Sequence, residues 1–183
     1  MKYTTRLRRT GDWKMPNRLK TGTFFVLLSL VVCGGTAQAA KISGVISATM
    51  TITEDSQLVG DVICTVTGAP CLDIGASNVT LDLNGFSITG LADPQTGCAG
   101  SQGSAEHGIR VLNQTGVTIR GPGIVQRFRT HGILINGSTG GAVTGVTTST
   151  NCMAGILLAG ASNVLENNIS IANGNTSAPC GGI

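Results

Sequence analysis

Two histidines are the residues in this sequence best suited to proton transfer, and each begins a similar short segment. The segments His107–Ile109 and His131–Ile133 both read His-Gly-Ile. If the chain stacks repeats at the interval between them, the imidazoles lie at one edge with Glu106 beside them, as a cluster for general acid–base chemistry. The alternative is a corner that favours small polar residues, two of which happen to be histidine. Ala154 and Gly181 occupy the equivalent positions later, so the row of histidines does not continue. His107 and His131 are therefore candidate catalytic residues.

Two acid–arginine pairs follow from the same alignment. Asp73 aligns with Arg110 and Asp82 with Arg120, so each carboxylate is expected to face a guanidinium on the neighbouring repeat. One interpretation is a set of cross-strand ion pairs, each stabilising the fold by at most ~1 kcal/mol. The other is a polysaccharide site, in which an acid takes a proton or holds calcium and an arginine neutralises a uronate carboxylate. On that interpretation Arg120 is catalytic, and Asp82 and Arg110 bind substrate.

A short basic segment lies just before His131. Arg127 and Arg129 flank Phe128 there, and together they could bind an acidic sugar. The alternative is a solvated turn in which Phe128 packs into a corner. We include Arg127 and Arg129 among the candidate substrate-binding residues. Beyond residue 39 the sequence has no tryptophan or tyrosine on which a sugar ring could stack.

These side chains need a scaffold that brings together residues from successive repeats, and the sequence supplies a regular period. Gly-Ile pairs begin at residues 108, 132, 155 and 182, and other short segments that alternate apolar and polar residues lie between them. Such segments are typical of half-buried strands, and glycine and asparagine punctuate their ends, where bends need positive φ. Because one repeat cannot bury its own apolar face, the pattern predicts an all-β solenoid of stacked parallel strands.

Other repeat folds fit less well. The Leu-x-x-Leu-x-Leu pattern of leucine-rich repeats is missing, and so is the strict six-residue period of a left-handed hexapeptide helix. An antiparallel sandwich remains an alternative, because many short strands separated by turns are typical of that fold too.

A family resemblance supports the solenoid. The segment NVTLDLNGFSITG at residues 78–90, followed by HGI and AGI repeats and the asparagine-rich VLENNISIANGN, resembles the right-handed parallel β-helix proteins of the pectate-lyase-like superfamily. The resemblance covers roughly residues 50–183 and implies a right-handed parallel β-helix with about three to four coils visible. That superfamily includes polysaccharide lyases and epimerases, but the fold alone does not imply an activity. The Gly-His-Gly and Asp-Pro-His-Glu motifs of its enzymes are missing here.

The N-terminal segment 1–39 resembles a secretory signal peptide. Basic residues precede an apolar run at Phe24–Val32, and Ala37-Gln38-Ala39 supplies a cleavage site. The run is shorter than the ~20 residues that span a bilayer, so we expect no stable membrane anchor. Met1 and Met15 are alternative starts. We therefore expect a signal peptide at 1–39, an N-terminal cap region at 40–70 and β-helix coils at 71–183, truncated at the C-terminus, in a secreted, periplasmic or cell-surface protein.

Charge and cysteine content fit export. Residues 40–183 hold five basic and eight acidic residues, a net charge of −3, so no nucleic-acid partner is expected. Cys64 and Cys71 flank a Gly-Pro turn and are expected to pair. Cys152 and Cys180 precede Gly-Ile segments of adjacent repeats and are expected to form a second disulfide, with Cys98 left over. The cysteine spacings do not indicate a metal site, and no cofactor is expected beyond calcium.

Two classes of function remain open. The absence of enzyme motifs favours an exported β-helix with a carbohydrate-binding or surface role. The alternative is a polysaccharide lyase- or epimerase-like enzyme that acts on an acidic glycan. In either case a bare last strand at Gly181–Ile183 would leave an open sheet edge that invites self-association.

Overall fold

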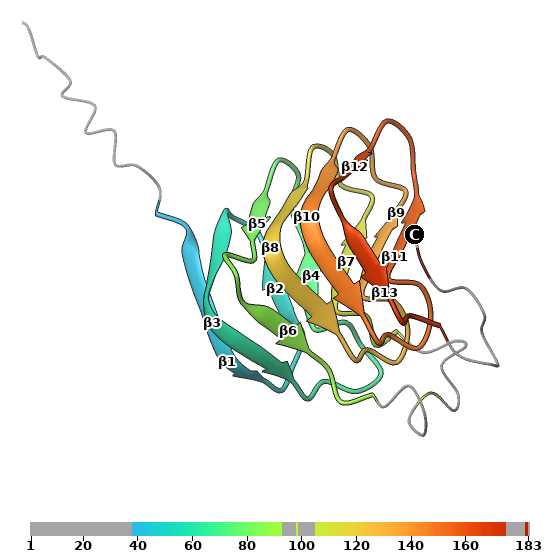
Figure 1. Ribbon diagram of the computed structural model, residues 1–183. Coiled ribbons are helices and arrows are strands. Elements are labelled where there is room, and N and C mark those ends of the chain that lie inside the picture. Colours follow the sequence, from blue (N-terminus) through green and yellow to red (C-terminus); the bar gives the residue numbers. More distant parts are fainter. Residues whose placement is uncertain (1–37, 93–97, 99–104, 175–181, 183) are drawn as a thin grey trace, which may run out of the picture. The chain divides into compact units, whose positions relative to one another are not determined.

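The computed structural model describes residues 38–92, 98, 105–174 and 182, and these contain strands but no helix. The strands form two sheets (Figure 1). The larger sheet contains β1 (Ala40–Ile46), β3 (Ser56–Cys64), β5 (Thr80–Asp82), β6 (Ser87–Thr89), β8 (Thr118–Gln126), β10 (Ala142–Ser149), β12 (Val164–Glu166) and β13 (Ile169–Ile171). The smaller sheet contains β2 (Met50–Ile52), β4 (Leu72–Ile74), β7 (Ile109–Leu112), β9 (Ile133–Asn136) and β11 (Ile156–Ala159).

The chain alternates between the two sheets as it advances. The larger sheet has the order β1-β3-β5-β8-β10-β12, and the smaller has β2-β4-β7-β9-β11, so each strand lies beside the one from the previous repeat. The colours of Figure 1 follow this progression from β1 to β13. Every ladder between the described strands is parallel, which overturns the antiparallel sandwich kept as an alternative. The chain is an all-β protein with parallel sheets.

The stack begins earlier than the sequence analysis placed it. Strands β1, β2 and β3 lie within residues 40–70, the expected cap region, yet their parallel ladders extend both sheets. The sequence signal was weak there because the step along the chain from Ala40 to its partner Ser56 is short. The later steps are longer, as in the step from Thr118 to its partner Ala142. The parallel stack therefore extends into residues 40–70, ahead of the segments that the sequence analysis aligned.

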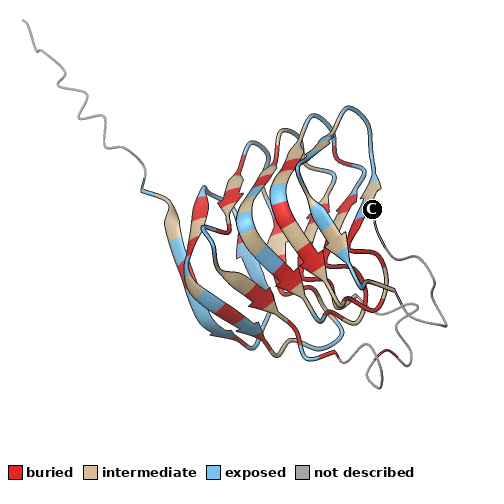
Figure 2. Ribbon diagram, in the orientation of Figure 1, coloured by how far each residue is buried: buried red, intermediate tan, exposed pale blue. Residues whose placement is uncertain are grey.

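Buried apolar residues from both sheets form one hydrophobic cluster, and the buried positions recur along the strands (Figure 2). In β5 and β8 the alternation holds as predicted, since Leu81 and Ile119 are fully buried. Thr80, Asp82 and Arg120 alternate with these buried residues and lie on the outer surface. Burial of each such aliphatic side chain stabilises the fold by roughly 1.5–3 kcal/mol.

The repeated His-Gly-Ile motif has a packing cause. A side chain at Gly132 would place its Cβ 2.7 Å from the carbonyl oxygen of Gly155 and 2.7 Å from Nδ2 of Asn151. At Gly108 the Cβ would lie 2.6 Å from the carbonyl oxygen of Gly132. Successive repeats therefore approach so closely at this bend that only glycine fits. As predicted, asparagines also occupy bends with positive φ, for example Asn78 at 59°.

Asparagine side chains join the last repeat to the one before it in a regular way. Oδ1 of Asn163 accepts the N–H of Gly141, and its Nδ2 donates to the carbonyl of Ser138. Asn168 and Asn173 repeat this pattern, with an N–H donor 22 residues earlier and a carbonyl acceptor 25 residues earlier. We call these three residues the asparagine braces.

In the part of the chain that the structure describes, no helix is long and apolar enough to cross a membrane.

Candidate functional site

A column of polar side chains crosses the outer surface of the larger sheet. Each member pairs in register with the member from the neighbouring strand. The column, here called the polar column, consists of Lys41, Gln57, Asp82, Arg120, Thr144 and Glu166. Neighbouring strands lie ~4.8 Å apart, so the column presents a charged, amide or hydroxyl group at that interval.

The middle of the polar column borders a hollow of about 230 Å³. Asp55, Gln57, Thr80, Asp82 and Arg120 line it, and we call these five residues the candidate site. Carboxylates, an amide, a hydroxyl and a guanidinium thus surround one depression on a flat sheet. These groups can donate to and accept hydrogen bonds from a polyhydroxylated ligand.

The predicted Asp82–Arg120 pair is confirmed at the centre of this site. Oδ2 of Asp82 accepts hydrogen bonds from Nη2 of Arg120 at 2.7 Å and from its Nε at 3.0 Å. Oδ1 of Asp82 accepts the N–H of Asn84 at 2.8 Å. The Arg120 side chain is 57% exposed and the Asp82 side chain 15%. The guanidinium is therefore presented to solvent, while its charge is balanced by a carboxylate held in place beneath it.

Asp55 is anchored at the rim of the hollow. Its Oδ1 accepts the N–H of Thr80 at 2.8 Å, across two neighbouring repeats. The sequence analysis did not single out Asp55, Gln57 or Thr80 as site residues. Their signal was the period itself, since Gln57 lies about one repeat before Asp82 and pairs with it.

The second predicted ion pair is confirmed on the smaller sheet. Arg110 donates from Nε to Oδ1 of Asp73 at 2.9 Å and from Nη2 to Oδ2 at 2.7 Å. This side-chain hydrogen bonding raises the pKa of Arg110. The Arg110 and Asp73 side chains are 26% and 24% exposed. They form a bidentate ion pair in which both carboxylate oxygens accept a hydrogen bond from the guanidinium. The structure thus separates Arg110 from the candidate site, to which β5 and β8 of the larger sheet contribute.

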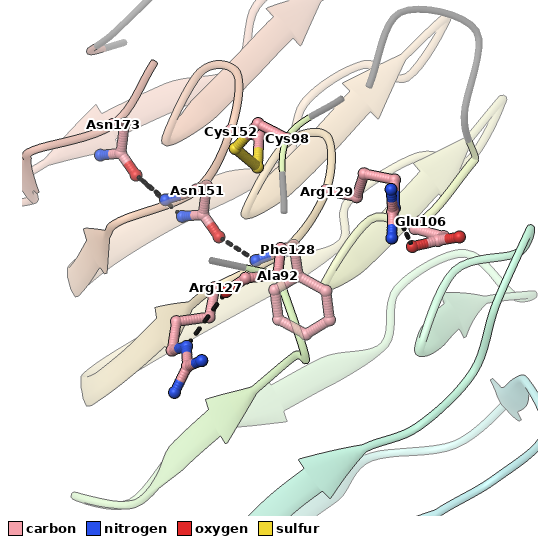
Figure 3. Close-up of a disulfide and its surroundings, with 9 residues drawn as sticks. All are labelled: Ala92, Cys98, Glu106, Arg127, Phe128, Arg129, Asn151, Cys152 and Asn173. Atoms are coloured by element: carbon pink, nitrogen blue, oxygen red, sulfur yellow. Dashed lines mark hydrogen bonds and ion pairs between the residues drawn. A yellow bond between two sulfur atoms is a disulfide. The ribbon is translucent and has the colours of Figure 1, made fainter. Parts of the chain in front are cut away.

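Arg127 and Arg129 line a different hollow, of about 130 Å³, together with Phe128 and Glu106 (Figure 3). Nε of Arg127 donates to the carbonyl of Ala92 at 3.1 Å. Nε of Arg129 lies 3.0 Å from Oε2 of Glu106, whose Oε1 accepts the N–H of Gly68. Phe128 is 3% exposed, so the expected packing of its ring in a corner is confirmed.

The two histidines stack as their spacing predicts. Their rings have centroids 5.5 Å apart and are inclined by 9°. His107 is 8% exposed and His131 7%, so both rings belong to the interior. Nδ1 of His107 lies 2.6 Å from Oγ1 of Thr130, which is buried, and Nδ1 of His131 is buried without a hydrogen-bond partner.

Burial sets the protonation state of this pair. Desolvation, the neighbouring His131 and then Arg110 lower the pKa of His107 to about 4, against a smaller opposing effect of Asp73. Desolvation also lowers the pKa of His131, partly opposed by a hydrogen bond to the backbone of Ala154. Both rings are therefore neutral near pH 7, and neither is presented to a polymer at the surface.

The described cysteines form two disulfides, one as predicted and one with a different partner. Cys64 pairs with Cys71, with Cα atoms 5.9 Å apart. Cys152 pairs with Cys98, with Cα atoms 5.4 Å apart, so the predicted Cys152–Cys180 bond is wrong (Figure 3). Cys98 belongs to the long connection between β6 and β7, and the repeat period does not predict its position beside Cys152. Cys180 lies outside the described residues.

Asn151 is one of the buried polar residues that the sequence analysis did not identify. It is fully buried, and its Oδ1 accepts the N–H of Phe128 while its Nδ2 donates to the carbonyl of Val125 and to Oδ1 of Asn173 (Figure 3). The repeat-length spacing between Asn151 and Asn173 was the available signal. Asn151 therefore satisfies backbone hydrogen-bonding groups at the bend and does not belong to the candidate site.

The described residues contain no group of three or more histidine, cysteine, aspartate or glutamate side chains placed to hold a metal ion. No family model matches the chain, and no curated protein or solved structure matches it.

Proposed function

We propose that this chain is an exported right-handed parallel β-helix of the pectate-lyase-like kind and that it binds a glycan at the candidate site. The alternation of the chain between two parallel sheets supports the solenoid, since parallel strands of one sheet are joined by right-handed crossovers in nearly all cases. The two disulfides support export, because such bonds persist in oxidising compartments. The apolar run and the Ala-Gln-Ala sequence that precede Ala40 support a signal peptide.

The hollow among Asp55, Gln57, Thr80, Asp82 and Arg120 is the observation on which glycan binding rests. Sugar hydroxyls are recognised by paired donors and acceptors, which this arrangement of carboxylates, amide and guanidinium supplies. The polar column continues above and below the hollow, so an extended polymer aligned with the column meets further polar groups on successive strands. Because Asp82 already neutralises Arg120 and the domain has a net charge of −3, the site favours a neutral glycan over a uronate polymer.

Binding without turnover fits the histidines better than catalysis does. A general base must come within hydrogen-bond reach of the proton that it removes. His107 and His131 are 8% and 7% exposed and are packed at a bend, away from the column. The alternative, a lyase or epimerase acting on an acidic glycan, would instead use the hollow lined by Arg127 and Arg129.

The test is a binding titration of the exported protein with a neutral polysaccharide and with polygalacturonate. We expect Gln57→Ala and Arg120→Ala each to weaken binding of the neutral polymer about tenfold, a change of about 1.4 kcal/mol. Arg110→Ala is the matched control, since this arginine also faces an aspartate but on the other sheet. An equal loss in Arg110→Ala, or no loss in either site variant, would refute the assignment. Cleavage of polygalacturonate that depends on Arg127 would favour the enzyme.

A further inference from the structure

The two end strands of the larger sheet are complementary to each other. Among the described strands, β1 pairs only with β3, and β12 and β13 pair only with β10. Each end therefore presents a strand edge whose backbone groups can accept a further parallel strand. Because the described strands of the larger sheet all run parallel to one another, the last strands of one molecule can meet the first strand of another in parallel.

The polar column ends in opposite charges. Lys41 is its member on β1, and Glu166 is its member on β12. Both are exposed. If a second molecule continues the stack in register, its Lys41 lies beside Glu166 of the first, at the ~4.8 Å spacing of neighbouring strands.

A second column ends in apolar residues at both edges. Ladder pairing connects Val45 on β1 through Ile63, Thr89, Gln126 and Ser149 to Ile171 on β13. Val45 is 67% exposed and Ile171 58% exposed. Continued stacking would place these two side chains together and remove both from water, which is favourable.

The core is also less complete at the β12 end. Val143 and Ile119 are fully buried, whereas Leu165, the next residue in that ladder, is only partly buried. The inward row at this end can therefore accept a covering strand with an inward aliphatic face, and Ile42 and Ile46 of β1 form such a face. Ile169 pairs with the outward residue Thr147 and is 58% exposed on the outer surface.

We infer that copies of this chain associate head to tail, with β1 of one molecule adding in parallel to β12 and β13 of the next. Ile171 follows Glu166 by five positions and Val45 follows Lys41 by four, a mismatch that one β-bulge accommodates, as the β1–β3 ladder itself shows. The contact is heterologous, so it does not close and builds chains of molecules whose polar columns are continuous. This inference does not rest on glycan binding.

Disulfide trapping tests the register directly. The full chain is expressed with its own leader, purified from the exported fraction and studied on a Cys180→Ser background. Because parallel neighbours lie within disulfide reach, a mixture of Val45→Cys and Ile171→Cys should give a cross-linked dimer on mild oxidation. Val59→Cys mixed with Ile171→Cys is the matched control, since Val59 is 44% exposed but lies on the inner strand β3. Cross-linking of the control to the same extent, or of neither pair, would overturn the proposal.

Charge reversal tests the energetics by sedimentation velocity. Wild type should form oligomers that grow with concentration. Lys41→Glu and Glu166→Lys, which place like charges at the junction, should each weaken association on the order of fivefold, and the double reversal should restore it. Circular dichroism and melting confirm that the variants are folded. A wild type that stays monomeric at every soluble concentration, as it would if the chain's own later residues cover β12 and β13, would contradict the inference.

Discussion

The bends that precede β7, β9 and β11 hold polar side chains, as the polar column does, but the two groups differ in burial. At these stacked bends His107, Thr130, His131 and Asn151 are at most 8% exposed, and with Cys152 they form what we call the buried corner. On the column, the Arg120 side chain is 57% exposed. In the buried corner, the Asn151 side chain satisfies backbone hydrogen-bonding groups, whereas on the polar column Arg120 faces solvent. The comparison teaches that residue type and spacing locate polar clusters, whereas burial decides which of them a ligand can reach.

The disulfide of the buried corner should give the largest effect. Cys98 and Cys152 are 54 residues apart, whereas Cys64 and Cys71 are 7 apart. If cross-links act mainly on the unfolded chain, loss of the long loop costs about 4 kcal/mol and loss of the short one roughly 2.5 kcal/mol. Denaturant titration of the two double alanine variants measures both values. Equal losses would show that strain or residual structure outweighs loop length.

Asn151→Ala should come next. It leaves the N–H of Phe128 and the carbonyl of Val125 without their partner in a dry site, so we expect a loss of about 3 kcal/mol. Asn163→Ala is the matched control, since it breaks the same kind of bond pair in a half-buried place that water can enter. We expect about 1 kcal/mol there. A control variant as unstable as Asn151→Ala would remove the distinction between corner and surface.

The stability of the corner should depend on pH. His107 has an ordinary pKa of 6.5 when unfolded and about 4 when folded, so between these values the unfolded state binds more protons. Stability therefore falls as pH decreases from 6.5 toward 4, by roughly 2 to 3 kcal/mol. His107→Gln should flatten this part of the curve in urea titrations at stepped pH. An unchanged slope in the variant would show that another group titrates.

The smallest effect should come from the polar column. Arg120→Ala removes an ion pair with a mostly exposed guanidinium, so stability should change by less than ~1 kcal/mol, and less still in high salt. Arg110→Ala, which opens the more buried fork on Asp73, should cost more than Arg120→Ala. Thermal melts of both variants at low and high salt test this order. A large loss in Arg120→Ala would mean that the column has a structural role.

The repeat period explains which features could be predicted from sequence. It places His107 beside His131, whereas the pairs of Asp73 with Arg110 and of Asp82 with Arg120, which are 37 and 38 residues apart, follow from aligning similar strand segments across the longer connection. Inward and outward positions also follow on β5 and β8, where residues alternate. At bends the alternation stops, so the burial of both histidines could not be deduced.

The Cys98–Cys152 bond and the early strands escaped prediction for a related reason. The long connection between Thr89 and Ile109 interrupts the period, so nothing in the spacing says where Cys98 lies. The step from Ala40 to Ser56 is too short to match the later repeats. Of the candidate site, Asp82 and Arg120 were predictable as a pair. The hollow beside them also needs Asp55 and Gln57, which lie before the segments that the alignment included.

The asparagine braces all bond from a later repeat back to an earlier one. Each brace satisfies the N–H of a residue 22 positions earlier, so the bonds that complete the repeat at 138–151 are supplied by residues 163–173, which emerge later during synthesis. The hydrogen bonds of the repeat at 138–151 are therefore complete only when residues 163–173 have folded onto it. It follows that the amides of Gly141, Val146 and Asn151 should lose hydrogen-exchange protection together whenever the last repeat opens.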